Sequence, residues 1–439
     1  MHHLLGFVLA ALALQPIATL ALTVHVTPTQ LLDVAPSTNE SLAQRWTVAP
    51  SASGEQIQSL EIDSFAQVFI SYEPQDSTDA ALPLVATVLV SGSDFKLITA
   101  ADVLALAPAT LTIRLLDASQ LDGIDGFVGV HVILHQQHVV QRVHATGEGD
   151  VVITDSVLVE NDPRANVSVD ARGGTRVYLP SHVNLTANSV SLSTSGSASV
   201  YLPTASRIQA PSISLLQSGS GAIAATSSAL QVLHTLAVAS SGVGSVCIDA
   251  TFIETNVIRV DASSAGDVYV GGHDGSYEAT NHYFCDASQV FQSGPGAVDL
   301  GTILCIDSDV EIDGSGDVTV SSARSLAGHA HGKGKILYAG EMPIDILPVD
   351  PWARVTQPIA HPVEGYSPRT CSVPSAPARR LSRIAGRTSR RVITPTHVGV
   401  VALLALCIGA VYAVESRRQR LARQRRTDER TPLLSQGRQ

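Results

Sequence analysis

The sequence has few of the apolar patterns that make helices. Between Gly147 and Val320 no series of apolar residues at positions i, i+3, i+4 and i+7 continues for three turns. The same windows are rich in Ser, Thr, Val and Gly, which are weaker helix formers than Leu, Glu or Lys. This absence excludes a helical architecture for the central part of the chain and favours strands.

The chain also has no recognisable catalytic arrangement. Carbohydrate-cleaving enzymes with β-helical folds need paired carboxylates, or a basic residue beside a metal ion, along one groove. The repeats described below contain Arg172, Arg176, Arg207 and scattered aspartates, but no such set. We therefore expect no enzymatic activity and no cofactor, and keep a carbohydrate-active enzyme as the alternative class.

A metal-binding signature is missing as well. Asp307, Asp309, Glu311 and Asp313 alternate along one expected strand, where they would either collect Ca²⁺ or form a solvated face. The solvated face is favoured because the chain has no glycine-rich calcium nonapeptide. The histidines within residues 131–138 do not all share one strand face. No metal site is expected.

What the sequence does contain is a repeat. A glycine near a small residue precedes a branched apolar residue at a spacing of about 23 residues, which is typical of stacked repeat architectures. The glycines of this phrase are Gly149, Gly174, Gly196, Gly221, Gly244, Gly266, Gly296 and Gly316.

Each glycine is followed by a short alternating segment. In Val177-Tyr178-Leu179 the first and third residues are apolar, the period of two of a half-buried strand. Glycine suits the preceding corner because it adopts positive φ without steric cost. We predict an all-β, parallel β-solenoid, or β-helix, whose rungs stack so that one residue per repeat forms an inward column. The column residues are Val177, Val200, Ile223, Val246 and Val268.

The repeats occupy residues 146–341, and residues 22–145 precede them. This first region has strand-like segments but no glycine repeat. We interpret it as an irregular β cap, because terminal repeats are usually atypical. A separate small β-domain is the alternative.

Three segments carry a family resemblance. Ile57 to Ser71, Leu111 to Leu115, and His144-Ala145-Thr146-Gly147-Glu148-Gly149-Asp150-Val151 with the Ser/Gly repeats after it resemble the head GIN domain of auto-transporter adhesins. The likeness spans roughly residues 55–320. It implies a β-helical head and a role in adhesion, with no catalytic residues to transfer.

The two ends of the chain suggest a membrane topology. Residues 1–21 read as a signal peptide, and residues 342–391 as a Pro/Arg-rich stalk. Residues 396–414 are expected to form one transmembrane helix, and residues 415–439 a cytoplasmic tail. These features predict a single-pass type I membrane protein of the cell surface and endolysosomal membrane.

The tail contains a sorting-like motif. Glu429 precedes the Leu433-Leu434 pair in the arrangement of an acidic dileucine signal, which predicts a clathrin adaptor as a partner. Arg390-Arg391 resembles a proprotein-convertase site, at which the head would be shed.

Residues 22–378 are acidic, whereas the residues after them are basic. Residues 22–378 carry 36 acidic and 14 basic residues, so this part of the chain should repel nucleic acid. No nucleic-acid partner is expected.

The remaining candidates are modification sites and one surface. Cys247, Cys285, Cys305 and Cys371 suggest two disulfides, with Cys285–Cys305 favoured because their spacing is close to one repeat, and with Cys371 as a candidate for bridging a second chain. Asn-X-Ser/Thr sequons predict glycosylation at Asn39, Asn166 and Asn184.

Tyr178, Tyr201 and Tyr269 occupy the same outward slot of three repeats. They would form an aromatic ligand platform, or simply reflect strand propensity and cross-strand packing. Together these patterns predict a glycoprotein with an adhesin-like head that binds a glycan or protein ligand. A structural coat is the other non-enzymatic alternative.

Overall fold

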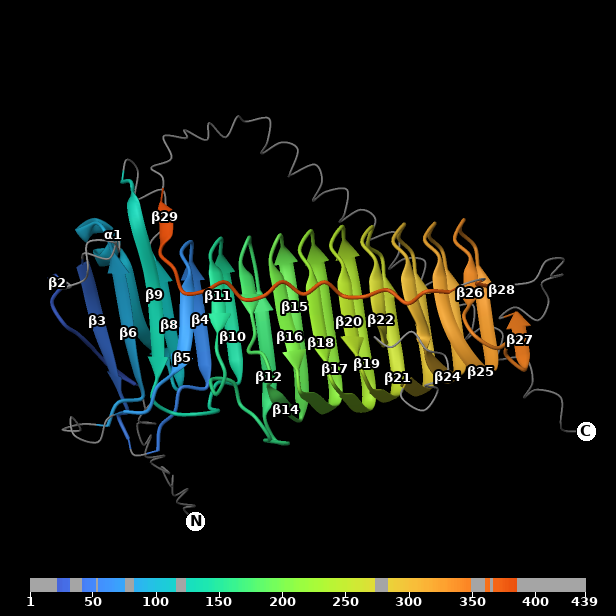
Figure 1. Ribbon diagram of the computed structural model, residues 1–439, viewed down its shortest axis with the longest axis horizontal. Helices are drawn as coiled ribbons and strands as arrows, with labels where there is room; N and C mark the ends of the chain where they lie inside the picture. The colour runs from blue at the N-terminus through green and yellow to red at the C-terminus, as the bar shows by residue number, and fades with distance from the viewer. Residues whose placement is uncertain are drawn as a thin grey trace, which may run out of the picture. The chain divides into compact units, whose positions relative to one another are not determined.

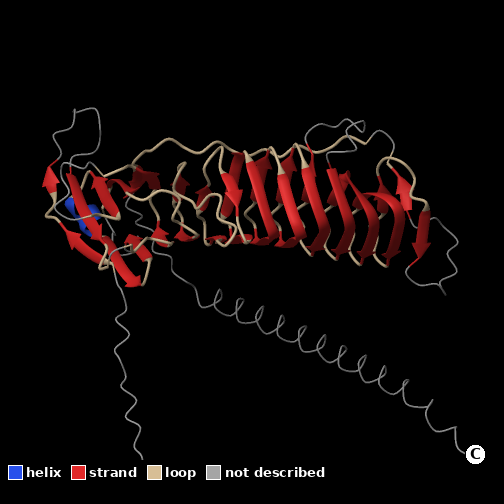
Figure 2. Ribbon diagram, turned by 90° about the horizontal axis from the view of Figure 1, so that it is seen from below, coloured by secondary structure: helices blue, strands red, loops and turns tan. Residues whose placement is uncertain are grey.

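The computed structural model describes residues 22–31, 42–52, 54–75, 83–115, 124–272, 283–348, 360–363 and 366–384. The chain divides into two compact units, Met1–Gly386 and Arg387–Gln439, and every described residue lies in the first. Strands dominate that unit and belong to one hydrogen-bonded sheet system (Figures 1 and 2).

The amino-terminal region contains nine strands and one short helix among its described residues. They are β1 Thr23–Val26, β2 Gln30–Leu31, β3 Leu42–Ala49, β4 Ser59–Ser64, β5 Val68–Tyr72, β6 Ala86–Gly92, α1 Phe95–Thr99, β7 Ala101–Ala107, β8 Thr110–Leu115 and β9 Gly126–Leu134.

The repeats form stacked rungs, each with strands on either side of a glycine corner. Their strands are β10 Arg142–Gly147, β11 Asp150–Ile153, β12 Asn166–Ala171, β13 Arg176–Tyr178, β14 Asn184–Thr186, β15 Ser189–Gly196, β16 Ser199–Ala205, β17 Arg207–Gly219, β18 Ile223–Ser227, β19 Leu230–Gly242, β20 Val246–Ala250, β21 Ile253–Ala262, β22 Val268–Gly272, β23 Tyr283–Gln292, β24 Val298–Ile312, β25 Val318–Ala330 and β26 Ile336–Tyr338.

Neighbouring rungs pair in parallel and in register. Val177 lies opposite Val200, Val200 opposite Ile223, Ile223 opposite Val246, and Val246 opposite Val268. All five side chains are fully buried. The inward column predicted from the repeat is therefore present.

The glycine corners allow the rungs to approach closely. Gly219 has a φ of 118°, in the left-handed region that favours glycine. A Cβ atom at this position would clash with the carbonyl oxygen of Gly196 in the preceding rung. That same oxygen accepts a hydrogen bond of 2.6 Å from the Ser220 N–H, so the corner leaves no space for a side chain.

The amino-terminal region is built differently. β3 pairs antiparallel with β6, and β6 antiparallel with β9, while β4 and β5 join the parallel rungs through β10 and β11. α1 packs Leu97 and Ile98 into the core at this end of the stack (Figure 2). Strand direction is therefore mixed.

The predicted fold class, a parallel β-solenoid with a transmembrane helix, is wrong as a description of the chain. The described sheet mixes parallel and antiparallel pairs because the region before the repeats has no glycine-corner period to keep its strands parallel. Among the described residues no helix is long and apolar enough to cross a membrane.

The membrane predictions fail with that helix. The single-pass type I topology, the cell-surface and endolysosomal localisation, and the clathrin adaptor all depended on it, and the described part of the chain gives them no support. The signal peptide at 1–21, the span at 396–414, the tail at 415–439 and the Arg390-Arg391 site lie outside the described residues.

The segment predicted as a stalk takes an unexpected path. β27 Asp345–Pro348 and β28 Ala360–Pro362 extend the stack at its carboxyl-terminal end, and β29 Ser382–Ile384 pairs antiparallel with β9 at the other end. Residues 366–384, here called the strap, therefore run back across the rungs, as the orange trace of Figure 1 shows. The chain is extended here, as its prolines predict, but it packs against the stack.

Core packing in a single strand gives a direct test of this architecture. In β19, Leu236 is fully buried, whereas Leu233 is 52% exposed. Leu236→Ala should lower the free energy of unfolding by about 3 kcal/mol, because it leaves a cavity between rungs. Leu233→Ala should cost less than about 0.5 kcal/mol. Urea unfolding followed by circular dichroism measures both, and equal losses would contradict the inward assignment.

Candidate functional site

The predicted tyrosine platform lies in an outward column, here called the ladder. From β5 to β24 its residues pair rung by rung. They are Phe69, Val152, Tyr178, Tyr201, Ala224, Cys247, Tyr269 and Asp299. The Tyr178 and Tyr201 rings are neighbours, with centroids 5.2 Å apart, while Ala224 and Cys247 separate Tyr269 from them.

The ladder does not face solvent along its whole length. Tyr178 is 5% exposed and Tyr269 is 2% exposed, although both occupy outward positions. Burial raises the pKa of both phenols, and the carboxylates of Asp150 and Asp249 respectively act in the same direction. An open platform of three tyrosines is therefore not what this structure presents.

The strap carries an aromatic and a basic side chain to one end of the ladder. The Tyr366 hydroxyl donates a 2.8 Å hydrogen bond to Asp299 Oδ1. Arg369 forms ion pairs with both Asp267 and Asp299. Burial alone would raise the pKa of Asp267, but hydrogen bonds from the Ala297 N–H and from Arg369 outweigh it and lower that pKa.

The other end of the strap is held around Gln67. This buried side chain accepts a 2.6 Å hydrogen bond from the Arg380 N–H and donates one of 3.3 Å to the Ala378 carbonyl. The Gln67 N–H donates to the Ser382 hydroxyl at 2.7 Å. The Arg380 guanidinium lies 3.6 Å from Asp150, which also pairs with Arg176.

The described residues contain two disulfides, which differ in burial. Cys285 and Cys305 face each other on adjacent rungs and are fully buried, the pairing that their spacing favoured. Cys371 of the strap bonds to Cys247 of the ladder in the same chain, so it does not bridge to a second chain. Both cysteines of this second bond are half-buried.

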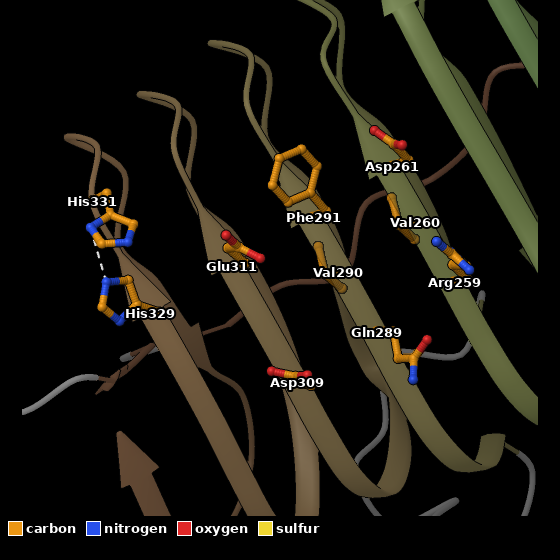
Figure 3. A pocket seen from close by; sticks show the side chains of 10 residues that line it. All are labelled: Arg259, Val260, Asp261, Gln289, Val290, Phe291, Asp309, Glu311, His329 and His331. Atoms are coloured by element: carbon orange, nitrogen blue, oxygen red, sulfur yellow. Dashed lines mark hydrogen bonds between the residues drawn. The ribbon is translucent and has the colours of Figure 1, made fainter. Parts of the chain in front are cut away.

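A second surface is open. On the outer face of β21, β23, β24 and β25 lies a groove with a volume of about 740 Å³. It is lined by Arg259, Val260, Asp261, Gln289, Val290, Phe291, Asp309, Glu311, His329 and His331 (Figure 3). Apart from His331, which follows β25, its polar and aromatic side chains come from two columns, Arg259–Gln289–Asp309 and Asp261–Phe291–Glu311–His329.

The acidic residues of this groove stand out by their lack of partners. Within the described residues Asp261 of β21 and Asp309 and Glu311 of β24 form no hydrogen bond or ion pair. Asp307, also on β24, is paired with Arg324. Phe291 is 37% exposed and lies between Asp261 and Glu311 in its column. The groove thus combines unneutralised acceptors with an accessible aromatic face.

Two histidines close one end of the groove. His329 Nε2 and His331 Nδ1 are 2.9 Å apart and share a hydrogen bond. The described residues contain no group of three or more His, Cys, Asp or Glu side chains that could hold a metal ion.

Only some of the predicted modification and sorting sites lie within the described residues. Asn166 and Asn184 are exposed on β12 and β14, and glycosylation at both stays a prediction. Asn39 and the sorting motif of Glu429, Leu433 and Leu434 lie outside the described residues.

Parts of the groove are visible in the sequence as separate patterns. The sequence predicts one solvated strand face for the alternating acids from Asp307 to Asp313. In the structure Asp307 pairs with Arg324, and of these four acids only Asp309 and Glu311 line the groove. Aligning β21, β23 and β24 by their glycine corners would have placed Phe291 beside Glu311. The pairing register of these strands follows from the positions of the glycines, so this part of the groove could have been found from the sequence.

Part of the rung-forming segment matches a known protein family. Residues 203–341 match the family model described as "Putative auto-transporter adhesin, head GIN domain". No curated protein matches the chain.

Solved structures give further likenesses. One is a "putative adhesin" from Parabacteroides merdae, at 12% identity and a TM-score of 0.32, covering 78% of this chain and 97% of that chain. Another, from Parabacteroides distasonis, is titled "Putative lipid binding protein", at 12% identity and a TM-score of 0.31, covering 73% of this chain and 96% of that chain.

His131 couples the fold to pH near the strap. Its ring contacts Phe69 edge-on and shares a 2.8 Å hydrogen bond with the Ser71 hydroxyl. Burial, with a further contribution from Arg379, lowers the pKa of His131 from 6.5 to about 4. The folded protein therefore holds this imidazole neutral where an unfolded chain would protonate it.

This difference predicts a loss of stability in acid. Between pH 6.5 and 4 the unfolded chain binds a proton at His131 and the folded protein does not, so lowering the pH favours unfolding by at most about 3 kcal/mol. His131→Gln should flatten the stability profile over this window in urea titrations. Substituting the exposed His234 in the same way is the control and should leave the slope unchanged. An unchanged slope in His131→Gln would refute the assignment.

Proposed function

We propose that the protein is a non-enzymatic binding head whose role is adhesion or ligand capture through the open groove. One observation supports this proposal above all. Three unpaired carboxylates lie beside an exposed phenylalanine in a groove with a volume of about 740 Å³. Concave sites with an apolar surface and a few convergent polar groups are the usual form of ligand pockets.

The chemistry of the lining selects the ligand class. Carboxylates are acceptors only, so Asp261, Asp309 and Glu311 suit a ligand rich in hydrogen-bond donors. Their combined charge exceeds that of Arg259 and disfavours an anionic ligand. The Phe291 ring offers a flat apolar face of the size of a sugar ring. A neutral glycan fits these features best, and the proposal commits to it.

The family match supports binding over catalysis. Residues 203–341 include the strands that form the groove, and the matched family is described as an adhesin head. Because fold alone does not define function, the side chains of the groove are the main support for binding.

Matched substitutions on β23 test the proposal. Phe291 lines the groove, whereas Phe284 on the same strand is equally exposed and does not. On a neutral-glycan array, Phe291→Ala should weaken the best-bound glycan about tenfold, corresponding to about 1.4 kcal/mol. Phe284→Ala should bind like the unaltered protein.

Two substitutions that each remove one negative charge extend the test. Asp309→Asn removes a groove carboxylate, and Asp286→Asn removes an exposed carboxylate of β23 outside the groove. Only the first should reduce binding. A flat array profile for the unaltered protein would refute glycan binding and favour a structural role, and equal effects of the two substitutions would remove the groove as the site.

A further inference from the structure

The strap is attached to the stack in an unusual way. Pro368, Pro374 and Pro377 have no N–H to donate, so most of the segment cannot become a regular strand of the sheet. Apart from the short β29 pairing, the described strap is held by side chains and by the Cys247–Cys371 bond. None of these contacts belongs to the backbone pairing that joins one rung to the next.

The surface around the ladder has space for the side chains of the strap. A Cβ atom at Gly301 would lie 2.8 Å from the Tyr366 ring, and one at Gly129 would lie 3.0 Å from a methyl group of Leu381. Glycine at these two places leaves room for strap side chains. The surface beneath the strap therefore has steric recesses in addition to charges.

The charges form a matching pattern. Asp267 and Asp299 meet Arg369 at one end, and Asp150 meets Arg380 at the other. With the strap in place, Asp150 and Asp299 are less than a tenth exposed, so the arginines of the bound strap pair with acidic groups that have little hydration of their own. The surface is thus complementary in charge to a basic, extended chain.

From these contacts we propose that the ladder is a peptide-binding track for an extended, arginine-bearing segment. The strap is its internal occupant, and the Cys247–Cys371 disulfide is the latch that keeps the track closed. This surface is distinct from the groove, and the proposal does not depend on the groove binding a glycan.

The two disulfides should respond differently to a reductant. Cys285 and Cys305 are fully buried, whereas Cys247 and Cys371 are half-buried at the surface. A thiolate of a small dithiol attacks one sulfur of Cys247–Cys371, breaking the S–S bond and forming a mixed disulfide. The second thiol of the reductant then attacks the mixed disulfide and displaces the remaining protein sulfur as a thiol. Two electrons and two protons pass to the protein, which gains two thiols, and the reductant leaves as its own disulfide.

The latch is tested on the full-length protein under native conditions. Titration with dithiothreitol, alkylation and mass spectrometry should label Cys247 and Cys371 at a reductant concentration at least tenfold below that needed for Cys285 and Cys305. Hydrogen exchange should then accelerate in residues 366–384 and not in β19. Labelling of all four cysteines together, or a strap that stays protected after reduction, would overturn the latch.

The track is tested with a defined probe. A fluorescent peptide of residues 366–384 carrying Cys371→Ser is added to a full-length variant with Cys371→Ser, Arg369→Glu and Arg380→Glu, in which the internal strap is weakened. Saturable binding, at least tenfold tighter than to the oxidised unaltered protein, is expected. The same peptide with Arg369→Glu and Arg380→Glu should bind at least tenfold more weakly.

The controls separate the track from general stickiness. Adding Asp267→Asn and Asp299→Asn to the receiving protein should reduce peptide binding at least tenfold, while Asp309→Asn in the groove should not. Equal binding of the two peptides, or absence of binding when exchange shows the strap released, would refute the track. Glycan binding in the groove can fail or succeed without changing either result.

Discussion

Backbone hydrogen bonding between successive rungs is the interaction on which the rest of the structure depends. β15 and β17 pair residue for residue from Ser189 with Ser212 to Gly196 with Gly219. Parallel pairing of this kind places equivalent positions of the repeat directly above one another. The character of each face is therefore set by columns of side chains, and a residue acts through its place in a column as much as through its own chemistry.

The inward columns contain apolar residues that fill the core and polar residues that bind the buried carbonyl groups of the glycine corners. Apolar residues fill most of the core, but the corners also bury carbonyl groups that need donors. Gln217 meets this need, because its side-chain amide donates to the carbonyls of Gly219 and Gly221, while Ser240 donates to its Oε1. Gln292 donates in the same way to Gly296. Polar residues inside the stack thus hold the glycine corners in place.

Sequence reasoning succeeded where the period is constant and failed where it is interrupted. The inward column could be read because Val177 and its equivalents recur at nearly equal spacing. The antiparallel pairing of β6 could not be predicted, because this strand is buried on both faces and its sequence shows no alternation of apolar and polar residues. Proline content predicted an extended segment after residue 342, but composition does not specify the surface that such a segment contacts. The Cys247–Cys371 pairing follows from that contact and was equally inaccessible.

The groove arises from side-chain size on an otherwise regular face. In the column that contains Arg259, the preceding rungs carry Ser168, Ser191, Ser214 and Ala237, all small. From β21 onward the same column carries Arg259, Gln289 and Asp309, while the adjacent column changes from Ala239 to Asp261, Phe291 and Glu311. The register between β21 and β23 is kept although residues 273–282 are inserted between β22 and β23, so the insertion does not displace the columns. One continuous backbone therefore supports a face of small side chains and a face with a groove, and the two differ in which rungs carry large side chains.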